Sequence, residues 1–134
     1  KIMSEQNGEL IIEPITTWKN AAGTENPVLA DSGTLAQGDT VIAKTRVINT
    51  TGEEKAFALS MGLFEGNNLL RFDFREVSLD GRSDAANKDA NLLCSFKMSE
   101  QDAASFTKAK AFLWDSITSM KPVTPSKAFN KTTE

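Results

Sequence analysis

Alternation of apolar and polar residues at every second position recurs along this chain and constrains its fold more than any other feature. In the clearest example, Val41, Ala43 and Val47 alternate with Lys44 and Arg46. Successive side chains of a β-strand point to opposite faces, so this pattern predicts a strand with one buried side. Similar segments follow along the chain, separated by clusters of Gly, Asn, Asp and Pro. The sequence therefore predicts an all-β fold.

The segments are numerous enough for an antiparallel β-sandwich of about seven strands. The main expected strands are residues 8–17, 28–30, 40–49, 55–65, 69–79, 90–98 and 108–115. Residues 99–105 begin like a capped helical turn, and Pro122 and Pro125 restrict any last strand to a sheet edge. We expect residues 1–134 to form a single domain, with an N-terminal strand and loop extension (1–27) and a C-terminal edge strand and tail (122–134).

Residues 55–65 and 69–79 flank a Glu-Gly-Asn-Asn turn, which predicts that they pair as a hairpin. In the first strand the large side chains alternate with a small face made of Ala56, Ala58, Ser60 and Gly62. That face is either a shallow groove for a neighbouring module or a sheet centre covered by long side chains from adjacent strands, and we favour the second. In the second strand, Leu70, Phe72 and Phe74 alternate with Arg71, Asp73 and Arg75. We expect the phenylalanines to follow the core.

Composition excludes several classes of function. The chain has 134 residues, of which 40% are hydrophobic and 25% charged, and its net charge is −3. These values indicate neither disorder nor a surface for polyanions, so no nucleic-acid partner is expected. No stretch approaches the roughly 18 apolar residues of a membrane helix, so no membrane insertion is expected. The N-terminal residues have no apolar region of a signal peptide, which leaves localisation open.

The chain has one cysteine, Cys94, and no histidine. An internal disulfide and a Cys/His metal site are therefore excluded, as is catalysis that pairs a nucleophile with histidine. Cys94 lies in an apolar run, which predicts a buried thiol rather than a reactive one. No glycine-rich phosphate motif occurs, so we expect no cofactor.

Carboxylates are the remaining candidates for chemistry. Glu65, Asp73, Glu76 and Asp115 lie in or beside expected strands, and a glycosidase needs only two acids across a cleft. Among the 18 acids of the chain such placements are expected by chance, so we interpret these residues as solvated surface and expect no enzyme activity.

A loop after the expected hairpin contains hard oxygen ligands of the kind that calcium prefers. Its candidate ligands are Asp80, Asp84 and Asp89. Arg82 and Lys88 in the same stretch favour an ordinary solvated loop. Calcium therefore remains the weaker of two interpretations.

Carbohydrate recognition relies on exposed aromatic rings with polar groups nearby, and the two tryptophans are the candidates. Trp18 lies where the first strand enters a polar loop, beside Asn20, and is either a sugar platform or a lid over the sandwich. Trp114 shares a strand face with Lys110 and Phe112, so strict alternation would place it outside. We nevertheless favour a core position for its large ring, reached by a bulge or a covered sheet face.

Residues 110–123, Lys-Ala-Phe-Leu-Trp-Asp-Ser-Ile-Thr-Ser-Met-Lys-Pro-Val, resemble a closing segment of immunoglobulin-like or fibronectin-like modules in secreted and cell-surface proteins of Firmicutes. Those modules also carry a strand ending in Asn-Thr, similar to residues 46–52, and a Gly/Asn turn like that of residues 63–69. The matching pieces cover about half of the chain. The resemblance implies an immunoglobulin-like sandwich that is secreted or displayed on a bacterial surface.

The same resemblance implies a non-catalytic accessory module that acts as a structural or spacer element beside other domains of its polypeptide. A carbohydrate-binding module, using an exposed tryptophan and polar loop residues, is the alternative. The partners would then be neighbouring domains or a polysaccharide.

Overall fold

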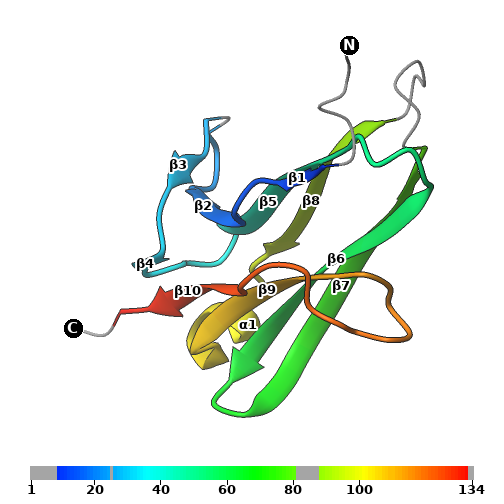
Figure 1. The fold of residues 1–134 in the computed structure, drawn as a ribbon. Helices are drawn as coiled ribbons and strands as arrows, with labels where there is room; N and C mark the ends of the chain where they lie inside the picture. Colours follow the sequence, from blue (N-terminus) through cyan, green and yellow to red (C-terminus); the bar gives the residue numbers. More distant parts are fainter. Residues whose placement is uncertain (1–8, 25, 81–87, 133–134) are drawn as a thin grey trace.

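The computed structural model describes residues 9–24, 26–80 and 88–132 and consists of two five-stranded sheets packed face to face (Figure 1). The first sheet contains β1 (Leu10–Ile12), β2 (Thr16–Asn20), β3 (Val28–Leu29), β5 (Thr40–Asn49) and β8 (Asp89–Lys97). The second sheet has the order β4 (Ser32–Gly33), β10 (Lys127–Lys131), β9 (Lys108–Trp114), β6 (Lys55–Glu65) and β7 (Asn68–Leu79). All named pairs are antiparallel except β4 with β10. The all-β prediction is confirmed.

The described residues form ten strands rather than about seven, because the edges of the sandwich are built from short pieces. The strand expected at residues 8–17 is divided into β1 and β2, which pair with successive parts of β5. Pro14 lies between them and has no N–H to donate to the ladder. β2 continues to Asn20, into residues expected to form a loop, and β10 lies between β9 and β4 instead of at an edge.

The core lies between the inner faces of the two sheets. Val41 and Ala43 of β5 and Leu59 of β6 are completely buried, as the alternation predicts. Cys94 of β8 is also fully buried, and its thiol donates a hydrogen bond to the carbonyl oxygen of Leu59 at 3.3 Å. Burial raises the pKa of this thiol to about 12. The prediction of a buried core cysteine is confirmed.

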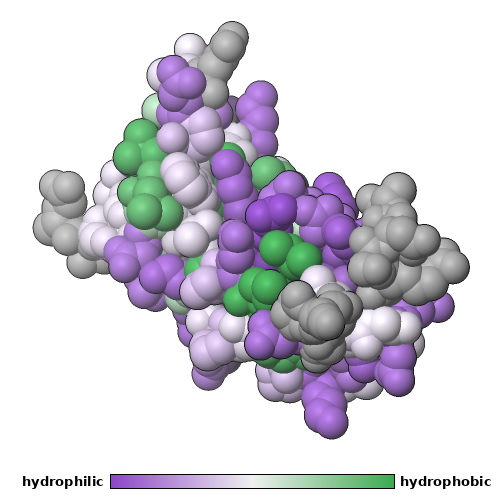
Figure 2. Space-filling model, turned by 45° about the horizontal axis from the view of Figure 1, so that its top comes forward, coloured by the Kyte–Doolittle hydropathy of each residue, from purple (hydrophilic) through white to green (hydrophobic). Residues whose placement is uncertain are grey.

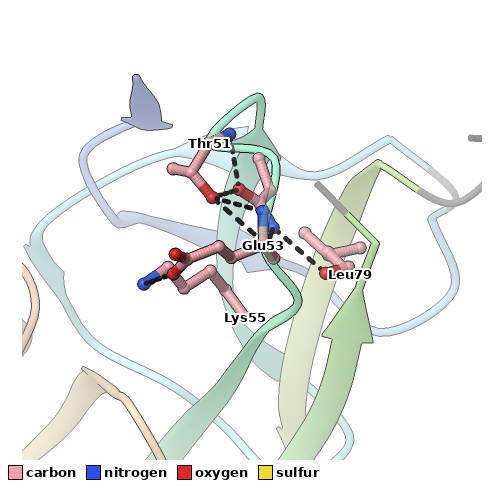
Figure 3. Close-up of polar contacts among 5 residues, drawn as sticks. Thr51, Glu53, Lys55 and Leu79 are labelled. Carbon is pink, nitrogen blue, oxygen red and sulfur yellow. Dashed lines mark hydrogen bonds and ion pairs between the residues drawn. The ribbon is translucent and has the colours of Figure 1, made fainter. Parts of the chain in front are cut away.

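A buried amide fixes the turn by which β5 of the first sheet leads into β6 of the second (Figure 3). The side-chain nitrogen of Asn49 donates to the carbonyl oxygens of Glu53 at 2.8 Å and Leu79 at 3.0 Å. Its oxygen accepts from the backbone N–H of Thr51 at 3.1 Å and from the Thr51 hydroxyl at 2.8 Å. Asn49 is fully buried with its hydrogen-bonding capacity satisfied, so it holds the ends of β5, β6 and β7 together.

The helix α1 (Glu100–Ser105) follows β8 and confirms the expected helical turn. The hydroxyl of Ser99 accepts from the N–H of Asp102 at 3.0 Å, while the Asp102 carboxylate accepts from the N–H of Ser99 at 3.1 Å. Asp102 also accepts from Arg71 of β7 at 2.9 Å, which ties the helix to the second sheet. No helix within residues 9–24, 26–80 and 88–132 is long and apolar enough to cross a membrane.

Candidate binding surface

The aromatic side chains of β7 point away from the core. Phe72 and Phe74 are 45% and 40% exposed, and they lie opposite Gly62 and Ser60 on the outer side of β6. The expectation that these phenylalanines belong to the core is therefore wrong. Apolar alternation on β7 identifies a face but does not determine which side of the sheet that face occupies.

A β-bulge at the start of the hairpin explains the inversion. Phe64 pairs with Leu69, but the next residue of β6, Leu63, pairs with Arg71 and leaves Leu70 as the extra residue. Because opposite residues share a face, the extra residue exchanges the two faces of β7 relative to β6. Without the bulge, Leu63 would lie opposite Leu70, and Phe72 would face the core.

On β9, strict alternation holds and places a second pair of rings on the outer side. Ala109, Ala111 and Leu113 are buried against the core, whereas Phe112 and Trp114 are partly exposed. The prediction of a core position for Trp114 is wrong, because the register of β9 against β6 is regular and no bulge turns the ring inward.

Together, Phe72, Phe74, Phe112 and Trp114 form what we call the outer aromatic face of the second sheet. The rings of Phe112 and Trp114 are 5.5 Å apart, and those of Phe72 and Trp114 are 6.5 Å apart, with interplanar angles of 24° in both pairs. Phe74 lies 6.1 Å from Phe72. Two strands, β7 and β9, thus bring together rings that lie far apart in the sequence.

The small face of β6 lies between the two pairs of rings. Ala58 and Ser60 are fully buried although they point outward, because long side chains from β7 and β9 cover them. A β-carbon added to Gly62 would lie 2.7 Å from the Phe64 ring and 2.9 Å from Leu69, so a larger residue would require these two side chains to shift. Of the two interpretations of the small face, the covered sheet centre is the one that the structure contains.

Charged and hydroxyl groups border the outer aromatic face. The ammonium groups of Lys110 and Lys108 lie 5.4 Å from the Phe112 ring and 5.7 Å from the Phe64 ring. The segment 115–121 follows Trp114 and is closed by the N–H of Asp115, which donates to the carbonyl oxygen of Lys121 at 2.9 Å.

Hydrogen bonds within the segment 115–121 give it a fixed shape. The Ser119 hydroxyl donates to the Asp115 carboxylate and lowers the pKa of that carboxyl group, and the N–H groups of Lys121 and Ser116 add to the effect. The Ser116 hydroxyl accepts from the N–H of Ser119 at 3.0 Å. Asp115 and Glu76 line a shallow depression of about 230 Å³ at this end of the outer aromatic face.

Trp18 lies on the outer side of the first sheet, so the structure does not bring it together with Trp114. Its indole N–H donates to the Thr16 hydroxyl at 2.9 Å, and the Lys44 ammonium lies 4.5 Å from its ring centre. Asn20 is the last residue of β2, and its side chain accepts a hydrogen bond from the hydroxyl of Thr24 at 2.8 Å in the turn that follows. The proposed carbohydrate residues thus divide between opposite faces of the sandwich.

A groove of about 290 Å³ crosses the first sheet next to Trp18. Its lining residues are Pro14, Thr16, Lys44, Thr45, Asn91, Leu92 and Leu93. Figure 2 shows a face on which polar surface, in purple, surrounds smaller apolar groups, one of them at the left on the side of β3. The exposed side chains of β3 are Val28 and Leu29, at 65% and 60%.

The proposed calcium ligands do not form a described site. Asp89 makes a hydrogen-bonded ion pair with Arg46 at 2.6 Å, which occupies one of its carboxylate oxygens. Asp84 and the rest of residues 81–87 lie outside the described residues, and Asp80 precedes them. In the described ranges, no three His, Cys, Asp or Glu side chains are grouped as a metal site would require. Calcium at Asp80, Asp84 and Asp89 stays a prediction.

The four acids considered for catalysis are dispersed. Glu65 is exposed in the hairpin turn, and Asp73 pairs with Arg75 at 2.9 Å on the opposite side of β7 from the rings. Only Glu76 and Asp115 line the same depression.

The sequence matches no protein-family model and no curated protein.

Proposed function

We propose that this domain is a non-catalytic accessory module of a secreted bacterial cell-surface or polysaccharide-active protein, and that its outer aromatic face contacts a neighbouring domain of the same polypeptide. The observation that carries this proposal is the exposure of Phe72 and Phe74 beside Phe112 and Trp114. Contiguous apolar surface of this kind marks interaction sites, and aromatic residues are enriched at the cores of protein interfaces.

The immunoglobulin-like assignment and the extracellular setting rest on the resemblance of residues 110–123 to closing segments of such modules. A two-sheet antiparallel sandwich is compatible with that assignment. The resemblance includes Phe112 and Trp114, which supply the two β9 rings of the outer aromatic face. The segment that suggests the family is thus also part of the proposed contact surface.

The hydrogen bonds of Asp115 argue against a general-acid role for this residue. A general acid in glycoside hydrolysis needs a raised pKa, so that it is protonated when the leaving group departs. The pKa of Asp115 is lowered instead, chiefly by the hydrogen bond from Ser119. We therefore assign Asp115 a structural role in shaping the segment 115–121.

Carbohydrate binding by the same face is the second candidate. Near-parallel rings on β7 and β9, the two strands that flank β6, provide apolar contact, and Lys110 and the segment 115–121 supply polar groups at its rim. This version moves the binding site from Trp18 to Trp114, because Lys44 covers the Trp18 ring.

The experiment compares the stability of this domain alone with its stability inside the parent protein. If a neighbouring domain covers the outer aromatic face, the domain should melt at a higher temperature in the parent, and Phe112→Ser should remove that difference. Leu93→Ser, at a 43% exposed position on the first sheet, is the matched control and should leave the difference intact. Equal melting temperatures in both settings would contradict the proposal.

Affinity electrophoresis in gels containing plant or cell-wall polysaccharides tests the second candidate. Retardation of the wild type that Trp114→Ala abolishes and Trp18→Ala preserves would favour carbohydrate binding over the spacer role. Mobility unchanged by every polysaccharide would remove this candidate.

A further inference from the structure

β7 ends the second sheet, with β6 on one side and no paired strand on the other among the described strands (Figure 1). It is 12 residues long. The free edge of a strand presents unpaired N–H and C=O groups, which can pair with a strand of another molecule. Natural edge strands are usually short or interrupted. β7 has its bulge at Leu70, near its start, and its pairing with β6 is regular from Arg71 to Leu79, so this longer part of the edge is an opening for such pairing.

The side chains of β7 form two contrasting rows. The outer row contains Phe72 and Phe74, which would be partly covered by an added strand. The inner row contains Arg71, Asp73 and Arg75, whose charges alternate in sign. Inward charges on an edge strand normally discourage association, but a row of alternating sign can also be complementary to itself.

We propose that β7 pairs antiparallel with β7 of a second copy of this chain, about a two-fold axis at Phe74. In this register Asp73 lies opposite the partner's Arg75, and the symmetry repeats the same pair on the other side of the axis. Phe74 lies opposite the partner's Phe74, which adds an aromatic cross-strand pair on the outer side. Complementarity is concentrated at these three residues around the axis, because farther out Phe72 lies opposite the partner's Glu76 and Arg71 lies opposite the partner's Val77.

Charge decides between this register and its neighbours. Opposite residues must share a face, so the register can change only by keeping inner residues opposite inner residues. An axis at Asp73 would place that carboxylate opposite its own copy and Arg71 opposite the partner's Arg75. An axis at Arg75 would place the two Arg75 side chains opposite each other. Both arrangements bring like charges together.

An axis at Phe72 would place Arg71 opposite the partner's Asp73, but the Arg71 guanidinium already donates hydrogen bonds within its own chain. Its Nη1 donates to Asp102 and to the carbonyl oxygen of Lys97, both at 2.9 Å, and its guanidinium lies 5.0 Å from the Phe96 ring. The axis at Phe74 leaves these contacts intact.

The Asp73–Arg75 pair is available to a second copy. Nη1 of Arg75 donates to Asp73 at 2.9 Å and to the carbonyl oxygen of Phe74 at 2.8 Å, and the two side chains of the pair are 53% and 31% exposed. A guanidinium has five N–H donors, so donors remain for the carboxylate of the partner. The association shares Phe72 and Phe74 with the outer aromatic face, but it rests on the inner pair of Asp73 and Arg75, so substitutions at this pair test it separately from the proposed function.

Sedimentation equilibrium over a range of concentrations tests the proposal with three samples. The wild type should rise from the monomer mass of 14.6 kDa toward twice that value. Asp73→Arg and Arg75→Asp, each alone, should weaken self-association on the order of tenfold or more, because two cross-strand pairs change from attraction to repulsion. An equimolar mixture of the two variants should regain the wild-type affinity as a heterodimer, since each supplies the charge that the other lacks.

The matched control is the double variant Arg46→Asp/Asp89→Arg, which exchanges the charges of a similar pair on the first sheet and should associate like the wild type. A wild type that stays at 14.6 kDa up to about 1 mM would overturn the proposal, since no useful affinity would remain. A dimer that both single variants preserve would place the contact elsewhere and overturn it equally. Circular dichroism of each variant establishes that it is folded before the masses are compared.

Discussion

The outer faces of the two sheets differ in how far their aromatic rings are covered by other side chains of the chain. On the first sheet, Lys44 covers the Trp18 ring, and Arg46 pairs with Asp89 and, at 3.9 Å, with Glu13. On the second sheet, Phe72 and Phe74 remain 45% and 40% exposed beside two further rings. The first sheet also exposes Val28, Leu29 and Leu93, at 65%, 60% and 43%, but these aliphatic side chains lie on its edge strands and its tryptophan has a polar cover. The second sheet instead gathers four rings into one face, and for this reason we place the proposed contact surface there.

The largest expected effect is a difference in the rate of thiol labelling between a core position and a position on the outer aromatic face. Cys94 is fully buried with a raised pKa, so a thiol reagent reaches it only when the domain opens. A cysteine at the outer position, Phe72→Cys in a Cys94→Ala background, should react at least about a thousandfold faster under native conditions. Similar labelling rates for the two thiols would show that position 72 is no more accessible to solvent than the core position 94.

A buried and an exposed phenylalanine should differ in how much each contributes to the free energy of unfolding. Phe129 of β10 is completely buried, and Phe129→Ala should reduce the free energy of unfolding by about 3 to 5 kcal/mol. Phe74→Ala, at an exposed site, should reduce it by less than about 1 kcal/mol. Urea unfolding of the two variants measures both values. A loss at Phe74 as large as that at Phe129 would mean that the outer aromatic face is part of the core.

Trp114 should show an intermediate effect. Its ring is partly exposed and contacts Phe112 and Phe72, so Trp114→Ala should cost about 1 to 2 kcal/mol in the free energy of unfolding. The cost expected for a core tryptophan is about 3 to 5 kcal/mol. Thermal unfolding distinguishes the two values. A loss in the higher range would restore the core interpretation that alternation argues against.

The smallest effect concerns the polar cover of the first sheet. Lys44→Ala should change the free energy of unfolding by less than about 1 kcal/mol, because an exposed cation over a ring contributes little. It should nevertheless increase quenching of Trp18 fluorescence by acrylamide, measured in a Trp114→Phe background. Unchanged quenching would show that Lys44 does not shield the ring.

Alternation in the sequence predicted the architecture where a strand has a single apolar side. For β5, the buried Val41 and Val47 and the outward Lys44 follow directly from the pattern. For β9, alternation correctly places Trp114 on the outer side of the sheet. The prediction of a core position, which rested on the size of its ring, was wrong. A large aromatic side chain can remain on the surface when neighbouring rings and lysines cover part of it.

The orientation of β7 could not be read from its own sequence. Alternation fixes which residues share a face, but the choice between inside and outside depends on the single extra residue, Leu70, in the hairpin. The outer aromatic face was missed for the same reason. The charged row of β7 depends on the same choice. If the phenylalanines faced the core, Arg71, Asp73 and Arg75 would lie on the outer side with the small residues of β6. The bulge reverses both rows together.

Site-specific photo-cross-linking tests most directly whether the outer aromatic face is the contact surface of this domain. A benzophenone amino acid replaces Phe112 of that face, and in a separate variant it replaces Leu93 on the first sheet. On irradiation of the protein as its host produces it, Phe112 should give a cross-link to a neighbouring domain of the same chain, and Leu93 should give little. Cross-links from Leu93 alone, with none from Phe112, would contradict the account.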